Sequence, residues 1–232
     1  MSVRQLKKYL SSSLILCPIV SVQPDIVIGT ETWLSKDIKS SELFPDSYTV
    51  YRKDRDGTKG GGVLIAVKDN IKSSVVTELN SEAEILWVQL MTTHKRLLYI
   101  CAYYRSHVSD SASLELFENS LRRALLARNP KVIIGGDFNL PDWDWKTNTL
   151  KKPASFPNLH HKFLDIIDDL GMAQIVEEPT REDNTLDLVV TNTPNLIPRL
   201  EIMPGLSDHD IAYFEYVTKL DYEERKPRPV KI

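Results

Sequence analysis

The stretch KVIIGGDFNLP, residues 131–141, decides how this chain is organised. Its apolar run is followed by two glycines, a pattern typical of a short strand buried on both faces. Asp137 and Asn139 come directly afterwards, so a carboxylate and an amide stand where the strand ends. Taken alone, Asp-Phe-Asn at a strand end fits the capping of a turn as well as it fits catalysis. Other parts of the chain have to decide between the two.

Similar apolar runs bounded by turn residues recur along the chain and predict further strands. Two segments have helical spacing instead, SASLELFENSLRRALLAR at 111–128, with Asp110 or Ser111 placed to cap it, and HHKFLDIIDDLG at 160–171. Many strands with few helices predict sheets packed on each other with helices outside. The predicted strands are DIVIG (25–29), GGVLIAV (61–67), ILWVQLM (85–91), RLLYICAYY (96–104), KVIIGG (131–136), LDLVVT (186–191) and IAYFEYV (211–217).

Length and composition bound the kind of protein. The 232 residues, 42% of them apolar, can bury a sizeable core and favour one domain, which we expect at residues 1–219, followed by a basic tail or linker at 220–232. The net charge of −3 is too small for bulk attraction to nucleic acid. A polyanionic partner would therefore be held by local cations or by a metal.

The amino terminus and the cysteines indicate the cellular compartment of the protein. RQLKKYLSSSLILCPIV loosely resembles a signal peptide, but Pro18 interrupts it, so we expect a first helix packed on the core. No run approaches the roughly 18 apolar residues of a membrane span. Cys17 and Cys101 have neither metal-binding nor disulfide spacing, which favours a reducing, intracellular compartment.

Polar side chains stand at the ends of several predicted strands. Glu31 follows DIVIGT, Asp187 enters LDLVVT, and Asp208 and His209 precede the last strand. If these ends converge with Asp137, they form an acidic pocket suited to a hard cation such as Mg²⁺. A histidine beside it would act as a general base or as a donor to a phosphorane-like transition state, with Asp187 as the candidate carboxylate that orients it. This inventory indicates phosphoester hydrolysis.

The same residues carry a family resemblance. TETWL, YYR, GGDFN, TLDLVVTN and SDHD, in this order, resemble the endonuclease/exonuclease/phosphatase superfamily, the group of DNase I and the apurinic/apyrimidinic endonucleases. More narrowly, GGDFNLPDWDW, EEPTREDNTLDLVVTN and GLSDHD resemble the endonuclease domain of non-LTR retrotransposons, which precedes a reverse transcriptase in one polyprotein. The resemblance covers about residues 20–218, and the ordered set is specific although SDH alone is weak.

The resemblance implies a DNase I-like fold of class α/β, a four-layer αββα sandwich of two mainly antiparallel sheets with helices on both outer faces. It also implies roles for the matching residues. Glu31 would ligate the metal, Asp208 would add a contact to it or next to it, and Asp187 would orient His209. Asp137 would position or deprotonate the attacking water, Asn139 would bind the phosphate and orient Asp137, and Tyr104 would support the phosphate. Which residue is the general base stays open.

One departure from the family pattern concerns the amino terminus. The family's first strand carries an asparagine that completes the metal site, shortly before the first helix. This chain has no asparagine before Asn70, and SVRQLKKYL already resembles the start of that helix. We therefore expect the first strand to be missing, which removes one metal contact and leaves a sheet position unfilled.

Cations and aromatic residues suggest how DNA would be held. YRKDRDGTKGGG at 51–62 places Arg52 and Arg55 on one loop, and Arg105 follows Tyr104; these three arginines are the candidate substrate contacts, although such a loop is more often simply solvated. Trp143 and Trp145 either reach a groove or anchor their loop by burial. The remaining histidines are expected at the surface: His94, His107, His160 and His161.

The sequence thus predicts a DNA endonuclease, dependent on Mg²⁺ or Mn²⁺, that leaves a 3′-hydroxyl to prime reverse transcription. Its expected partners are DNA and a reverse transcriptase domain, its expected location is the nucleus, and no membrane is involved. The alternatives are another phosphoesterase of the superfamily, either an abasic-site repair nuclease or a phosphatase, and an impaired remnant that binds DNA without cleaving it or binds nothing.

Overall fold

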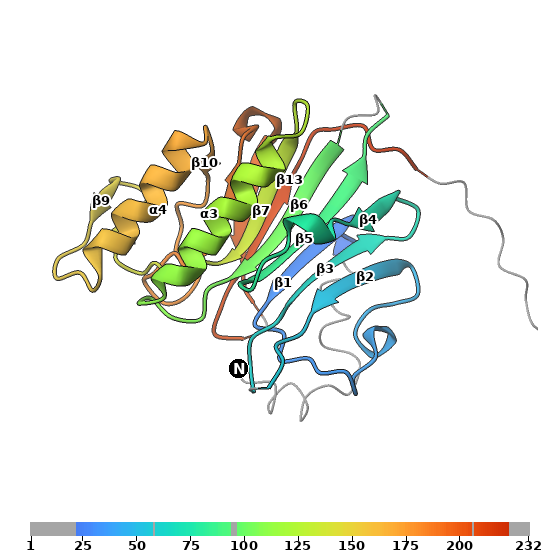
Figure 1. Cartoon of the computed structure of the whole chain (residues 1–232), viewed down its shortest axis with the longest axis horizontal. Coiled ribbons are helices and arrows are strands. Elements are labelled where there is room, and N and C mark those ends of the chain that lie inside the picture. The colour runs from blue at the N-terminus through green and yellow to red at the C-terminus, as the bar shows by residue number, and fades with distance from the viewer. Residues whose placement is uncertain (1–21, 58, 94–96, 206, 223–232) are drawn as a thin grey trace, which may run out of the picture.

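A six-stranded sheet forms the middle of the molecule (Figure 1). The computed structural model describes residues 22–57, 59–93, 97–205 and 207–222, so the expected first helix lies outside the described residues. The order of the sheet is β10-β11-β7-β6-β5-β4, and only β6 and β7 pair in parallel. Its strands are β4 (Ser73–Val75), β5 (Glu84–Met91), β6 (Leu97–Tyr104), β7 (Lys131–Asp137), β10 (Ala173–Gln174) and β11 (Asp187–Thr191).

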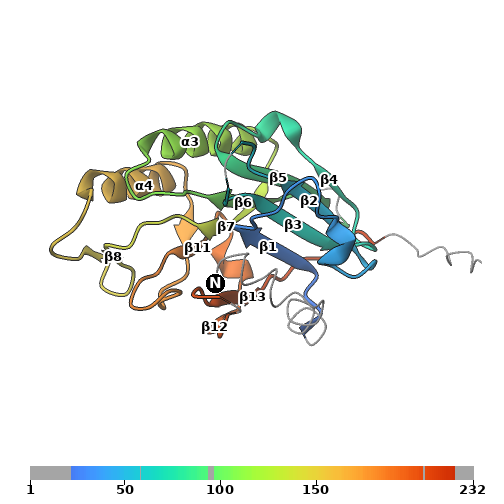
Figure 2. The ribbon, with the colours of Figure 1, turned by 90° about the horizontal axis from the view of Figure 1, so that it is seen from below.

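Two smaller sheets pack on one face of this sheet (Figure 2). One has the order β1-β3-β2, and the other pairs β12 with β13, all antiparallel. The strands are β1 (Ile26–Thr30), β2 (Tyr48–Lys53), β3 (Val63–Lys68), β12 (Arg199–Met203) and β13 (Ile211–Glu215). The short elements are η1 (Ser40–Glu42), η2 (Thr77–Leu79), η3 (Pro194–Leu196) and the hairpin of β8 (Trp143–Asp144) and β9 (Thr149–Leu150).

Helices α3 (Ser111–Leu125) and α4 (Pro157–Asp169) cover the opposite face of the six-stranded sheet (Figure 2). The predicted cap is present, because the Asp110 carboxylate accepts a hydrogen bond from the Ser113 amide at 3.0 Å. The apolar stripes of both helices are buried, as their spacing predicts. No helix among the described residues is long and apolar enough to cross a membrane.

Two apolar layers hold the sandwich together. The first lies between the helices and the six-stranded sheet, and the second between that sheet and the smaller sheets. Trp87 is fully buried in the first layer, where its indole N–H donates to the Ser120 hydroxyl at 2.8 Å. The predicted sandwich of two mainly antiparallel layers with outer helices is confirmed on this side. On the other outer face, the described residues provide only η1 and its loop.

The carboxyl-terminal boundary differs from the prediction. Leu220 is buried and bridges to Thr92, and Tyr222 bridges to Ile71. The folded part therefore extends to residue 222 and does not end at 219. The remainder of the predicted tail lies outside the described residues.

Candidate active site

Asp137 and Asp187 lie opposite each other on neighbouring strands. Asp137 ends β7, Asp187 begins β11, and the two are paired residues in the antiparallel register. Side chains of directly paired residues project from the same face of a sheet, so the two carboxylates are held close together. The pairing of β7 with β11 therefore places the carboxylates of Asp137 and Asp187 side by side.

His209 joins this pair through Asp187. Its Nδ1 lies 2.7 Å from Asp187 Oδ2, and both side chains are largely buried. Burial alone would lower the pKa of His209, but the hydrogen bond and the charge of Asp187 outweigh it and raise that pKa. The predicted orienting contact between Asp187 and His209 is present in the structure.

Hydrogen bonds to Thr180 hold both the start of β11, which carries Asp187, and the residue that follows His209. The Thr180 hydroxyl accepts hydrogen bonds from the amides of Leu186 and Asp187, at 3.1 and 3.0 Å, and the Thr180 carbonyl accepts from the amide of Asp210 at 2.7 Å. Gly205 is required in this loop, because a Cβ at that position would lie 1.7 Å from the His209 carbonyl oxygen. The segment around Thr180 thus joins the strand of Asp187 to the loop of His209.

Asn139 holds the carboxylate of Asp137 from two directions. The backbone N–H of Asn139 donates to Asp137 Oδ1 at 2.9 Å, and the side-chain Nδ2 donates to Asp137 Oδ2 at 3.1 Å. The same Nδ2 donates to the Arg105 carbonyl at 2.6 Å, and Asn139 adopts a left-handed backbone with φ +48°. Asparagine tolerates this conformation better than most residues. Asn139 thus contacts the carboxylate that the resemblance implies it orients.

Asp137 is buried, with 4% of its surface exposed. Burial raises its pKa to about 7, and the negative charge of Asp187 adds to this rise, while His209 and the Asn139 amide act in the opposite direction. A carboxyl group with a pKa near neutrality can both accept and release a proton under physiological conditions. The buried carboxyl group of Asp137 therefore lies beside Asp187 with a pKa near neutrality.

Glu31 and Tyr104 connect the smaller sheet to the larger one. The Tyr104 hydroxyl donates to Glu31 Oε1 at 3.0 Å, and Glu31 has a left-handed backbone with φ +51°. Burial, followed by the charge of Glu31, raises the pKa of Tyr104 well above its usual value, so the phenol stays protonated. The guanidinium of Arg55 lies over the Tyr104 ring, 5.7 Å from its centroid. The left-handed backbone of Glu31 is uncommon for a residue other than glycine, and such residues concentrate at functional sites.

The three predicted substrate-binding arginines differ in their environments. Arg52 pairs with Asp54 at 2.5 Å and donates to the carbonyls of Ile38 and Ser35, so it holds its own loop together. Arg55 forms an ion pair with Glu84 and remains beside Tyr104. Of these two, Arg55 is the one that borders the candidate site.

Arg105 is completely buried, with none of its surface exposed. Its guanidinium donates hydrogen bonds to five backbone carbonyls, and a buried guanidinium with these partners cannot reach a DNA phosphate. The prediction that Arg105 binds substrate is corrected accordingly: the residue holds the loop that carries Asn139. The accepting carbonyls belong to His107, Val108, Asp110, Phe138 and Asn139.

Asp208 makes an ion pair with Arg181, at 2.6 Å, next to His209 in the sequence. Thr180 and Arg181 were not assigned roles from the sequence, although both lie in the segment EEPTREDN that carries part of the resemblance. Their contacts with Asp208, Asp187 and Asp210 are the signal that this segment belongs to the site.

His160 and the loop tryptophans are structural. His160 has 1% of its surface exposed, its Nε2 accepts from the Asp142 amide at 3.1 Å, and its Nδ1 lies 3.1 Å from the Phe156 carbonyl. The prediction that it lies at the surface is therefore wrong. Trp143 is buried and its ring packs edge-on against that of Trp145. Of the two predictions for these tryptophans, the structure supports burial that anchors the loop.

The burial of His160 predicts an effect of pH on stability. Burial lowers the pKa of His160, so the unfolded chain binds the proton more tightly than the folded one. The contribution of His160 to stability is present above the unfolded pKa of about 6.5 and is lost as the pH falls below it. We expect the melting temperature to fall less between pH 7.5 and pH 5 in His160→Gln than in the parent or in His161→Gln, whose histidine is exposed. Equal falls in all three proteins would contradict this.

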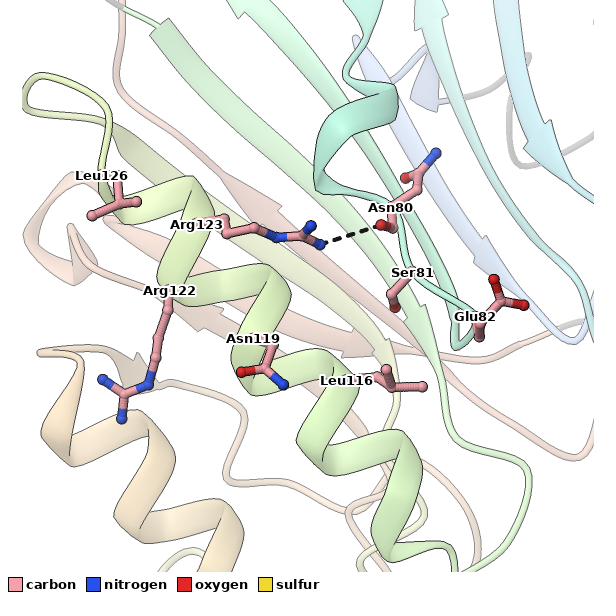
Figure 3. A pocket seen from close by; sticks show the side chains of 8 residues that line it. All are labelled: Asn80, Ser81, Glu82, Leu116, Asn119, Arg122, Arg123 and Leu126. Carbon is pink, nitrogen blue, oxygen red and sulfur yellow. Dashed lines mark hydrogen bonds between the residues drawn. The ribbon is translucent and has the colours of Figure 1, made fainter.

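The pocket drawn in Figure 3 is separate from these residues. It has a volume of about 540 Å³ and lies between α3 and the segment that follows η2. Arg123 crosses one side of it and donates to the Asn80 carbonyl at 3.2 Å. None of the residues that line it is a predicted site residue.

The donor set around Asp137 can be tested against a bound Mg²⁺. Among the described residues, no group of three or more His, Cys, Asp or Glu side chains is arranged to enclose a metal. Mg²⁺, however, is usually bound by one or two carboxylates, with water and substrate phosphate oxygens completing its shell. Glu31 offers such a carboxylate, oriented by Tyr104, and the charges of Asp187 and Glu31 both raise the pKa of Asp137. The chemistry of these groups fits a cation with few protein ligands.

Comparisons with known proteins place this geometry in a family. Residues 98–213, half of the chain, match the family model described as endonuclease-reverse transcriptase. A search of curated protein sequences found no match. The residues that match the family model include most of β6, the strand ends that carry Asp137 and Asp187, and His209.

Solved structures show the same fold at low sequence identity. The endonuclease domain of TRAS1, a telomere-specific non-LTR retrotransposon, aligns with a TM-score of 0.67 and 16% identity over 89% of this chain and 91% of that chain. The AP endonuclease LMAP from Leishmania major aligns with a TM-score of 0.70 and 14% identity over 92% and 83%. The 3′ phosphatase NExo from Neisseria, solved with a product DNA hairpin, aligns with a TM-score of 0.58 and 14% identity over 89% and 96%. The chain belongs to the endonuclease/exonuclease/phosphatase superfamily, in the family described as endonuclease-reverse transcriptase.

Proposed function

We propose that this chain is a DNA endonuclease, dependent on Mg²⁺ or Mn²⁺, from a non-LTR retrotransposon. The observation that carries the proposal is the arrangement at the ends of β7 and β11. There Asp137 pairs with Asp187 across the sheet, and Asp187 in turn holds His209 at 2.7 Å. Superfamily membership makes phosphoester hydrolysis the expected chemistry, and similarity to a retrotransposon endonuclease and to proteins acting on DNA supports the substrate.

The proposed reaction uses the chain's own residues as follows. Asp137 takes a proton from a water molecule, whose oxygen forms a bond to phosphorus while the bond from phosphorus to the 3′ oxygen breaks. The 3′ oxygen takes up a proton from solvent water and leaves as a hydroxyl, and the phosphate remains on the 5′ oxygen of the next nucleotide. His209, protonated more readily because of Asp187, donates a hydrogen bond to the phosphate from Nε2. A metal ion held by Glu31 would neutralise the charge that develops on the phosphate.

The proposed role in the element follows from the product. A nick with a 3′-hydroxyl can be extended by a polymerase, so a reverse transcriptase domain is the proposed partner and the nucleus the proposed location. Extension of the nicked plasmid by a DNA polymerase checks the 3′ end directly. A product that cannot be extended would rule out the priming role while leaving hydrolysis intact.

Nicking of a supercoiled plasmid tests the site. With Mg²⁺ present, we expect His209→Ala and Asp187→Asn each to slow nicking by roughly 10²–10⁴-fold. The double variant should be little slower than either single one, because the two residues act as a unit. Arg199→Ala, on the exposed face of β12, is the matched control and should keep the parental rate.

The same series separates the alternatives. Preferential cleavage of a duplex with an abasic site would favour a repair nuclease, and turnover of small phosphate esters would favour a phosphatase. Binding of DNA without cleavage, in Mg²⁺ and in Mn²⁺, would show that the chain is an impaired remnant. Activity that persists in His209→Ala would place the chemistry elsewhere.

A further inference from the structure

The backbone of Glu31 is strained and needs support from other residues. Glu31 is exposed, and its backbone is left-handed with φ +51°. A residue other than glycine keeps such a conformation only where the surrounding structure fixes it. Two sets of contacts do so, one to the side chain of Glu31 and one to the backbone that follows it.

The first set holds the side chain of Glu31 through Tyr104. The Tyr104 hydroxyl donates to Glu31 Oε1 at 3.0 Å, and the Arg55 guanidinium covers the Tyr104 ring. Arg55 in turn donates from Nε to Glu84 Oε1 at 2.5 Å. Glu84 and Tyr104 are directly paired residues of β5 and β6, so their side chains project from the same face of the sheet. Glu84 therefore holds the guanidinium over the ring of the residue that orients Glu31.

The second set holds the backbone that follows Glu31. The Thr32 amide donates to the Gly62 carbonyl at 3.2 Å. The Gly62 amide in turn donates to Glu84 Oε2, whereas Arg55 donates to Oε1 of the same carboxylate. Both sets of contacts therefore meet at the carboxylate of Glu84.

The ion pair between Arg55 and Glu84 is largely buried. The side chain of Glu84 is 17% exposed and that of Arg55 is 25% exposed. Gly61 lies against the guanidinium, because a Cβ at that position would overlap it. Removing one member of a buried pair leaves the other charge uncompensated. Loss of the Glu84 carboxylate should therefore displace Arg55 as well as release the Gly62 amide.

We propose that Glu84 is a positioning residue that sets both the side chain and the backbone of Glu31. Its route to the side chain runs through Arg55 and Tyr104, and its route to the backbone runs through Gly62. The inference rests on the proposed function, in which Glu31 offers a carboxylate to the metal. Residues that orient a metal ligand affect metal affinity and rate, so the effect of Glu84 should depend on the Mg²⁺ concentration.

Replacement of Glu84 by glutamine separates positioning from DNA binding. The glutamine amide has one acceptor oxygen, so it cannot accept from both Arg55 and the Gly62 amide. At saturating protein and limiting Mg²⁺, we expect Glu84→Gln to nick a supercoiled plasmid roughly 10–100-fold more slowly, and excess Mg²⁺ should restore part of the rate. If Arg55 contacted a DNA phosphate instead, loss of the competing charge would tighten DNA binding without slowing nicking. That result would overturn the proposal.

Hydrogen exchange in EDTA gives a readout that needs neither metal nor cleavage. Glu84→Ala removes both acceptor oxygens, so the Thr32 amide should exchange at least roughly 10-fold faster than in the parent, while the amides of β7 keep their parental rates. Glu118→Gln is the matched control, since it removes the carboxylate of a more exposed ion pair with Arg122. This control should change neither exchange at Thr32 nor nicking.

The two measurements fail in different ways. Parental nicking by Glu84→Gln at limiting Mg²⁺ would overturn the positioning role and leave the proposed function intact, even if Glu84→Ala does not fold. Parental exchange at Thr32 in folded Glu84→Ala would also overturn it. If the parent chain itself does not nick DNA, the proposed function fails, and the exchange experiment still decides whether Glu84 holds the backbone beside Glu31.

Discussion

Replacement of Asp137 by asparagine is expected to slow DNA nicking by roughly 10³-fold without lowering the stability of the fold. Asp137 is the buried carboxyl group whose pKa lies at about 7 and which faces Asp187 across the sheet. Asparagine keeps the shape of the side chain and one hydrogen bond to Asn139, but it cannot take a proton from water. Single-turnover nicking of a supercoiled plasmid at saturating protein measures the loss.

The same variant is expected to be more stable than the parent at high pH. An unfolded aspartate ionises near pH 3.9, whereas burial and the charge of Asp187 raise the pKa of folded Asp137 to about 7. Between these values the folded state binds the proton more tightly, so the free energy of unfolding of the parent falls as the pH rises. Asp137→Asn lacks this titration. Its advantage in melting temperature, measured in EDTA, should be largest above pH 7 and shrink toward pH 4.

An exposed aspartate gives the matched control for this pair of measurements. Asp169 lies at the exposed end of α4, and Asp169→Asn should change neither the nicking rate nor the dependence of melting temperature on pH. Parental nicking by Asp137→Asn would remove this residue from proton transfer. A melting temperature below that of the parent at pH 8 would show that the ionised carboxylate stabilises the fold.

Much of the fold was predictable because its elements have strong periodicity. Runs such as VLIAV and VIIGG have the length and composition of buried strands, and both form strands in the structure. The helix after Asp110 shows its cap and its apolar stripe in sequence as clearly as in the structure. The site was also predictable from strand ends, since Asp137, Asp187 and His209 all stand next to such ends. Pairing of β7 with β11 brings Asp137 and Asp187 together, and the contact with Asp187 holds His209 beside them.

The residues that sequence could not assign are those whose environment depends on distant parts of the chain. Arg105 and His160 resemble surface residues in sequence, because charged and histidine side chains usually are. Arg105 is buried because backbone carbonyls from two separate loops converge on it, and His160 because the Asp142 amide reaches its ring. Neither set of contacts produces a pattern in the sequence around Arg105 or His160. The short segment around Thr180 has no periodicity, and its role emerges only from its contacts.

Replacement of Arg105 by methionine is expected to lower the free energy of unfolding by roughly 2–5 kcal/mol, because it leaves buried carbonyl groups without donors. The guanidinium contacts Phe138 O at 2.7 Å and Asn139 O at 2.9 Å on one side, and Val108 O at 2.9 Å on the other. It therefore ties the start of α3 to the loop that carries Asn139. Such a loss corresponds to a fall in melting temperature of roughly 4–20 °C for a chain of this size.

Lysine at this position should give an intermediate result, because an ammonium group donates from one atom and cannot span both loops as the planar guanidinium does. Arg122→Met is the matched control: Arg122 is half-exposed on α3 and pairs with Glu118 one turn away, so its loss should change the free energy of unfolding by less than about 0.5 kcal/mol. Urea denaturation of all three variants measures these differences. If Arg105→Met unfolds at the same urea concentration as Arg122→Met, the carbonyls have found other donors and the loop does not depend on Arg105. If it unfolds earlier but nicks DNA at the parental rate while folded, Arg105 stabilises the fold without positioning Asn139 for the reaction.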